Sequence, residues 1–186
     1  MSTHDDWVRF LAVPVAVFSA AGAVHATQYL SAEQAQKLMF GASAQFERRS
    51  LKLEKDVARD IEKFSGVKVR FLDVPVWQVS DNGKPAGYFF VDEVYGKHEF
   101  ITYAVALDAD GRVRHVEILD YRETYGYQVR EAAWRAQFVG KSFADPLKFD
   151  ADIQNISGAT LSCRHITEGV KRILAIHDRM LKKAQP

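Results

Sequence analysis

The 186-residue sequence is poor in cysteine and proline and carries no excess of either charge. Its single cysteine, Cys163, excludes an internal disulfide and any zinc or iron–sulfur centre held by several cysteines of this chain. The 25 Lys and Arg residues nearly balance the 24 Asp and Glu residues, and no basic block stands out. This charge pattern argues against a nucleic-acid partner, because phosphate neutralisation requires clustered basic side chains.

The composition that remains is that of a globular protein, with 47% hydrophobic and 26% charged residues. A chain of this length can bury a sizeable core without disulfide or metal staples. No internal repeat or low-complexity stretch divides it. We therefore expect one main domain.

The N-terminal region predicts export. Residues 10–24 are uncharged and mostly apolar, and Val24-His25-Ala26 follows with residues typical of a signal-peptidase site. We predict that residues 1–26 form a signal peptide and that the mature protein works in the periplasm or at another extracytoplasmic membrane face. A retained membrane anchor and a buried N-terminal helix stay open as alternatives, since Asp5 and Asp6 outweigh Arg9 before the apolar run.

Residues 27–66 are predicted to form an N-terminal helical segment. Ser31 and Gln34 have the spacing of a capping box, which indicates a helix that ends near Gly41. A second charged helix is expected over residues 53–64, before Ser65-Gly66.

Residues 67–186 are predicted to form an α+β domain. Its expected architecture is a mostly antiparallel sheet of about five strands with helices packed against it, including a long C-terminal helix. The sequence Asp81-Asn82-Gly83 is typical of a hairpin turn. The predicted strands are 67–71, 74–79, 87–91, 100–107 and 112–119, and the predicted helices are 127–138 and 160–180.

A small hydroxyl-rich motif directly precedes the apolar face of the C-terminal helix. The start of a helix has backbone N–H groups without an intrahelical acceptor, which favours an anion such as phosphate there. The alternative is that Ser157, Thr160 or Ser162 merely caps the helix. The motif consists of Ser157, Gly158, Ala159, Thr160, Leu161 and Ser162.

This motif resembles the flavinylation motif of the FMN-binding domain family. The family includes covalent-flavin subunits of the sodium-pumping NADH:quinone reductase and of the Rnf complex. Two further stretches resemble the family: residues 121–126 are similar to its Glu-Thr-Pro-Gly loop, and residues 134–141 are similar to the segment that follows that loop.

The resemblance implies that residues 67–186 bind FMN covalently through a phosphoester on Thr160, made by a separate flavin transferase with FAD as donor. Two positions depart from the family pattern: Gln154 replaces an Asp three residues before the motif, and Tyr125 replaces the loop proline. Tyr125 could stack on the flavin ring. The other cofactor-binding residues implied are Ser157, Gly158, Ala159, Leu161 and Ser162 of the motif, and Glu123, Thr124, Tyr125 and Gly126 of the loop.

The function implied is electron transfer between a membrane redox subunit and an extracytoplasmic acceptor. We expect a redox carrier or oxidoreductase subunit rather than an enzyme with its own substrate site, and we predict no catalytic acid–base residues and no metal site. Two alternatives stay open. One is a module that binds FMN or another phosphate-bearing ligand without a covalent bond. The other is a structural accessory subunit with a decayed motif, of which Gln154 is a sign.

Two further residues stand out by their context. Gly169 lies inside the C-terminal helix, where glycine costs about 1 kcal/mol relative to alanine, so we expect close packing against it. His98, next to Glu99, lies in a polar loop between two predicted strands. It is predicted to be either a solvated loop residue or a proton relay or partner contact.

Overall fold

The computed structural model describes residues 27–182, so the predicted signal peptide lies outside the described residues. Within this range, none of the helices is both long and apolar enough to cross a membrane. The strands are β1 (Thr27–Gln28), β2 (Gln45–Lys52), β3 (Asp73–Asp81), β4 (Lys84–Tyr95), β5 (Phe100–Leu107) and β6 (Val113–Tyr121). The α-helices are α1 (Ala32–Phe40), α2 (Lys55–Ser65), α3 (Ala132–Arg135) and α4 (Thr160–Ile176).

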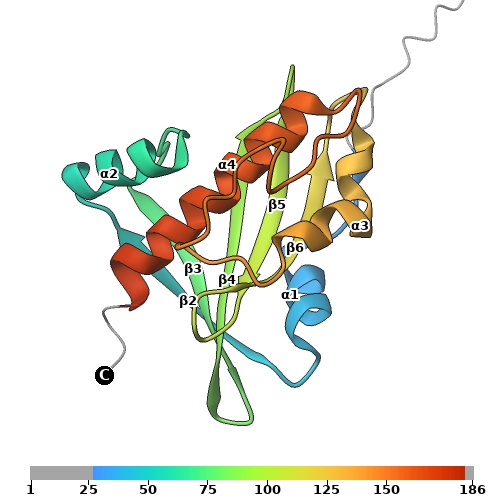
Figure 1. The fold of residues 1–186 in the computed structure, drawn as a ribbon. Coiled ribbons are helices and arrows are strands. Elements are labelled where there is room, and N and C mark those ends of the chain that lie inside the picture. Colours follow the sequence, from blue (N-terminus) through green and yellow to red (C-terminus); the bar gives the residue numbers. More distant parts are fainter. Residues whose placement is uncertain (1–26, 183–186) are drawn as a thin grey trace, which may run out of the picture.

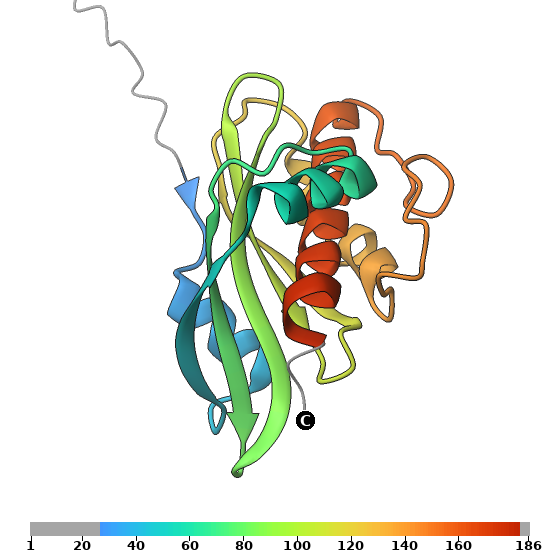
Figure 2. The same cartoon turned by 90° about the vertical axis from the view of Figure 1, so that its left-hand side faces the viewer.

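The strands form one antiparallel sheet in the order β1-β6-β5-β4-β3-β2. Helix α4 crosses one face of the sheet diagonally (Figure 1). Helices α2 and α3 lie on the same side as α4, whereas α1 lies on the other side (Figure 2). The predicted α+β fold with a long C-terminal helix is confirmed. The sheet has six strands: β3 to β6 correspond to predicted strands, and β1 and β2, one at each edge, were not predicted.

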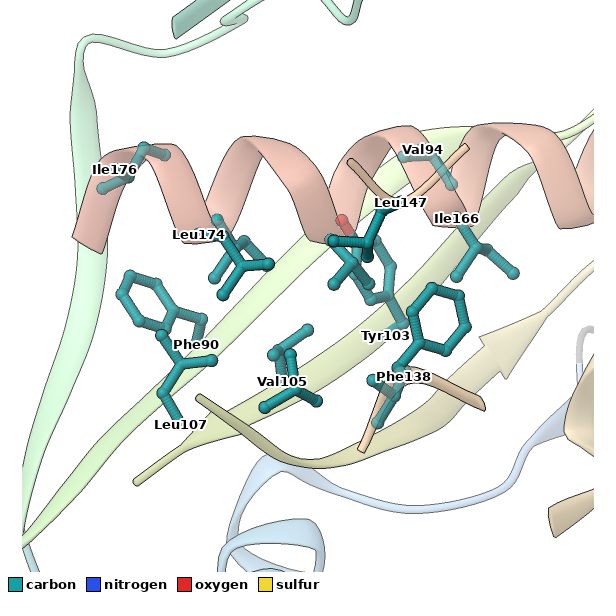
Figure 3. Packing of buried hydrophobic residues seen from close by; sticks show 14 of the residues in the cluster. Phe90, Val94, Tyr103, Val105, Leu107, Phe138, Leu147, Ile166, Leu174 and Ile176 are labelled. Atoms are coloured by element: carbon teal, nitrogen blue, oxygen red, sulfur yellow. The ribbon is translucent and has the colours of Figure 1, made fainter. Parts of the chain in front are cut away.

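The main core lies between the sheet and α4. Strand β5 alternates its side chains between the two faces: Tyr103 and Val105 pack under α4, whereas Ala104 belongs to the smaller cluster beside α1. Figure 3 shows Tyr103 and Val105 below the helix, with Ile166 and Leu174 pointing down onto them. This packing fixes the position of α4, and therefore of its first turn, on the sheet.

Gly169 packs closely against the sheet. A Cβ atom added to it would collide with the Tyr103 hydroxyl oxygen. That hydroxyl donates to the Asp92 carboxylate at 2.7 Å, and the Arg172 guanidinium donates to the same carboxylate oxygen at 2.5 Å. The predicted close packing at Gly169 is confirmed.

The N-terminal segment contains a strand that the sequence prediction missed. The Ser31–Gln34 capping box is present and opens α1, and Gly66 ends α2 as predicted. Between these helices, however, β2 pairs with β3 along its whole length. The description of residues 27–66 as helical is therefore incomplete, because this segment also supplies an edge strand of the sheet.

Two predicted elements differ from the structure. Residues 67–71 do not form a strand, although they are rich in β-branched residues. The Glu62 carboxylate accepts the Val69 N–H at 2.9 Å, and Arg172 donates to the Lys68 carbonyl at 2.9 Å, so side chains satisfy this backbone instead of a sheet ladder. The predicted helix over residues 127–138 is broken into two short 3-10 turns with α3 between them.

Candidate functional site

Helix α4 begins at Thr160, directly after a tight turn. Gly158 has φ +84°, a conformation that favours glycine, and Ala159 is the residue before the helix. No side chain of the described residues caps α4. The alternative prediction, that a hydroxyl of the motif caps the helix, is therefore wrong.

The first turn of α4 leaves polar groups unpaired. The first helical hydrogen bond runs from the Cys163 N–H to the Ala159 carbonyl at 2.9 Å. The N–H groups of Thr160, Leu161 and Ser162 therefore have no intrahelical acceptor. Thr160 is exposed, and in the described part of the chain no group hydrogen-bonds its hydroxyl. A hydroxyl group thus stands free beside donors that favour an anion.

The loop over residues 121–126 is held against this turn by Tyr121. Its hydroxyl donates to the Tyr125 carbonyl at 2.6 Å and lies 3.1 Å from the Ser162 hydroxyl. Burial raises the pKa of Tyr121, so its single proton is retained and goes to the carbonyl. We infer that Ser162 donates to Tyr121. Gly126, with φ +87°, allows the loop to come close: an added Cβ would lie 3.2 Å from Ala159.

The loop between β4 and β5 joins the same site through Glu123. One carboxylate oxygen of Glu123 accepts the backbone N–H groups of Lys97, of His98 at 2.6 Å and of Glu99 at 3.1 Å. Burial by itself raises the pKa of Glu123, but these hydrogen bonds outweigh it and hold the pKa below its ordinary value. The charged carboxylate therefore clamps the two loops together.

These three segments line one pocket of about 470 Å³, a volume typical of small-molecule sites. It lies at the end of the molecule where α4 begins, the upper end in Figure 1. Eight of the ten predicted cofactor-binding residues line the pocket, whereas Ser157 and Gly126 do not. The lining residues are Lys97, His98, Glu123, Thr124, Tyr125, Gly158, Ala159, Thr160, Leu161 and Ser162.

The segment that precedes the motif is anchored by the stretch over residues 134–141. The Trp134 indole N–H donates to the Gln154 carbonyl at 2.8 Å, and the Gln154 N–H donates to the Gln137 side-chain oxygen at 2.8 Å. Gln154 itself is exposed. The position that departs from the family pattern therefore faces solvent, and its backbone is fixed independently of its side chain.

The residues present fit a flavin nucleotide. The free hydroxyl and the three unpaired N–H groups of the first turn of α4 suit a phosphate ester. Tyr125 has 80% of its surface exposed, so its ring is available for stacking. Among the described residues, no base is hydrogen-bonded to the Thr160 hydroxyl.

Sequence reasoning missed three residues of this site. Lys97 and His98 line the pocket, and Tyr121 connects its two predicted motifs. The sequence predicts His98 as a relay or contact residue at most, and nothing in it places His98 beside Thr160. The pairing of Tyr95 with Phe100 sets the β4–β5 loop at this end of the sheet, and that pairing is visible only in the folded chain.

Comparison with known proteins supports this assignment. Residues 96–175 match the FMN-binding domain family. A subunit of the Na(+)-translocating ferredoxin:NAD(+) oxidoreductase complex of Acetobacterium woodii is 25% identical over 138 aligned residues, which cover 67% of this chain and 67% of that protein.

The crystal structure of NqrC from Shewanella oneidensis has the same fold. It superimposes with a TM-score of 0.53 and 21% identity, and the match covers 73% of this chain and 80% of that chain. The matched family region contains the β4–β5 loop, the loop over residues 121–126 and the motif at α4, which are the three segments that line the pocket. The resemblance predicted from the motifs is confirmed: residues 96–175 of this chain match the FMN-binding domain family.

Proposed function

We propose that this protein is an exported electron-transfer flavoprotein that carries FMN as a phosphoester of Thr160. It passes electrons between a membrane redox subunit and an extracytoplasmic acceptor. The observation that carries the proposal is the exposed Thr160 hydroxyl. It stands at the start of α4, which no side chain of the described residues caps, in a pocket that the two family motifs share.

A separate flavin transferase with FAD as donor accounts for attachment. The Thr160 oxygen forms a bond to the phosphorus of the FMN half of FAD, the pyrophosphate bond breaks, and AMP leaves. The hydroxyl proton goes to a base of the transferase, since no base of residues 27–182 is hydrogen-bonded to the Thr160 hydroxyl. Exposure of Thr160 gives such an enzyme access.

The residues of this chain then hold and orient the cofactor. The first-turn N–H groups of Leu161 and Ser162 face the single negative charge that a phosphodiester keeps. The Tyr121 and Glu123 contacts hold the two loops that wall the pocket. Bound FMN supplies the redox chemistry, and the protein sets its potential and its access to solvent and partners.

The proposed partners and location rest on the Acetobacterium relative and on the N-terminal sequence. That relative is named as a subunit of an ion-translocating oxidoreductase complex, which favours a membrane redox subunit as partner of this chain. The apolar stretch at residues 10–24 supports export or membrane attachment. A covalent bond keeps the cofactor on the protein outside the cytoplasm.

The experiment is coexpression with a flavin transferase, followed by intact-mass and visible spectroscopy. We expect a mass gain equal to FMN minus water in the wild type and in Ser157→Ala, and no gain in Thr160→Ala. Ser157 is the matched control, because it is an exposed hydroxyl of the same motif that does not line the pocket.

The other outcomes identify the alternatives. Yellow colour that dialyses away, with no mass gain, supports a non-covalent FMN-binding module. Colourless wild-type protein supports a structural accessory subunit. In that case Gln154→Asp tests the decayed motif directly, because restored attachment would locate the defect at this exposed position.

A further inference from the structure

We propose that Lys97 is the cation that binds the phosphate of the flavin nucleotide in this pocket. The inference rests on the proposed function and assigns a residue that lies outside both family motifs. Lys97 lies in the β4–β5 loop and lines the pocket together with Thr160. Thr160 is far from it in sequence and reaches the same pocket only through the fold.

The backbone of the β4–β5 loop cannot serve as the anion-binding element. The N–H groups of Lys97, His98 and Glu99 all donate to the Glu123 carboxylate. Their donor capacity is therefore satisfied within the protein. Any attraction that this loop exerts on a phosphate must come from its side chains.

The Lys97 ammonium group is available for that contact. In residues 27–182 no carboxylate forms an ion pair with it, and its side chain makes no hydrogen bond. Among the described residues that line the pocket, Lys97 alone has a permanent positive charge. The acidic residue that lines the pocket is Glu123, and its carboxylate already accepts hydrogen bonds from the three loop N–H groups.

Other basic side chains near the start of α4 make contacts elsewhere. The Arg164 guanidinium lies over the Phe149 ring, 4.9 Å from its centroid. His165 contacts the Tyr95 carbonyl through Nδ1. The fixed positive charge of the pocket therefore belongs to Lys97.

The test compares FMN with riboflavin, which differ by the phosphate alone. Protein made without a transferase is titrated with each flavin at about pH 8 and followed by flavin fluorescence. We expect the wild type to prefer FMN, Lys97→Met to lose about tenfold of that preference, and Lys97→Arg to keep most of it. The control is Lys84→Met, at the start of β4 and outside the pocket, which should behave as the wild type.

The initial rate of attachment with a fixed amount of transferase and FAD is the second readout. Lys97→Met should be slower than the wild type by a similar factor. Wild-type FMN preference and wild-type attachment rate in Lys97→Met would overturn the role of Lys97 while the proposed function stands. FMN preference that depends on Lys97, in a protein that is never modified, would overturn the covalent function and keep the phosphate site. Neither binding nor attachment in the wild type would overturn both.

Discussion

The contact between the two motifs can be tested by removing one oxygen atom, with Tyr121→Phe. The Tyr121 hydroxyl makes two hydrogen bonds, at 2.6 Å to the Tyr125 carbonyl and at 3.1 Å to the buried Ser162 hydroxyl. A neutral hydrogen bond contributes about 0.5–1.5 kcal/mol, and a buried group left unpaired costs about 1–3 kcal/mol. The carbonyl of exposed Tyr125 can turn to water, whereas Ser162 cannot. We therefore expect a loss of about 2 kcal/mol.

The assay is urea unfolding of the unmodified protein, supported by thermal melts. A loss of about 2 kcal/mol in a chain of this size lowers Tm by about 4–8 °C. Tyr127→Phe is the control, because Tyr127 is 60% exposed and lies in the neighbouring turn. It should change stability by less than about 0.5 kcal/mol.

A double-mutant cycle with Ser162→Ala isolates the contact between the two hydroxyl groups. We expect a coupling of about 0.5–1.5 kcal/mol, because Ser162→Ala removes the donor that Tyr121→Phe would leave unpaired. Equal stability of Tyr121→Phe and the wild type, together with additive effects of the two changes, would refute the assigned link between the loop and α4.

The remaining predictions concern packing and pH. Gly169→Ala should destabilise the protein by about 1 kcal/mol, because overpacking against the Tyr103 hydroxyl costs about 2 kcal/mol and a helix-propensity gain of about 1 kcal/mol offsets half of it; a stabilised variant in urea unfolding would contradict the close contact. The lowered pKa of Glu123 means that the contribution of its carboxylate to stability is present at neutral pH and is lost as pH falls below about 4.3. The free energy of unfolding of Glu123→Gln should therefore fall less steeply at acidic pH than that of the wild type. His177 is buried, its Nε2 has no partner in the described chain, and burial lowers its pKa. The stability tied to neutral His177 is present above about pH 6.5 and declines below it, so His177→Phe should lose that decline; an unchanged pH profile would contradict it.

The parts of the fold that sequence patterns predict are those with strong local signals. Strand β5 has the bounds that the sequence predicts, because it is a continuous apolar run. Strand β2 escapes prediction, because only Phe46 and Leu51 of its eight residues are even half-buried. An edge strand with charged, solvent-facing residues lacks the alternation of apolar and polar residues by which a strand is recognised. Strand β2 forms because it pairs with β3.

The same reasoning applies to the site. The motif at α4 and the loop over residues 121–126 could be predicted, because their residues match a family pattern. The position of Lys97 and the contact between Tyr121 and Ser162 could not, since they depend on the register of β4 with β5 and on how α4 packs on the sheet. The absence of a side-chain cap on α4 was likewise invisible in the sequence, because serine and threonine normally cap helices.

Peptide mass mapping of the protein purified from its own host tests the central claim most directly. The account predicts that the peptide containing Thr160 carries FMN as a phosphoester on that residue and that the intact protein absorbs blue light. An unmodified Thr160 peptide in a colourless protein would contradict it.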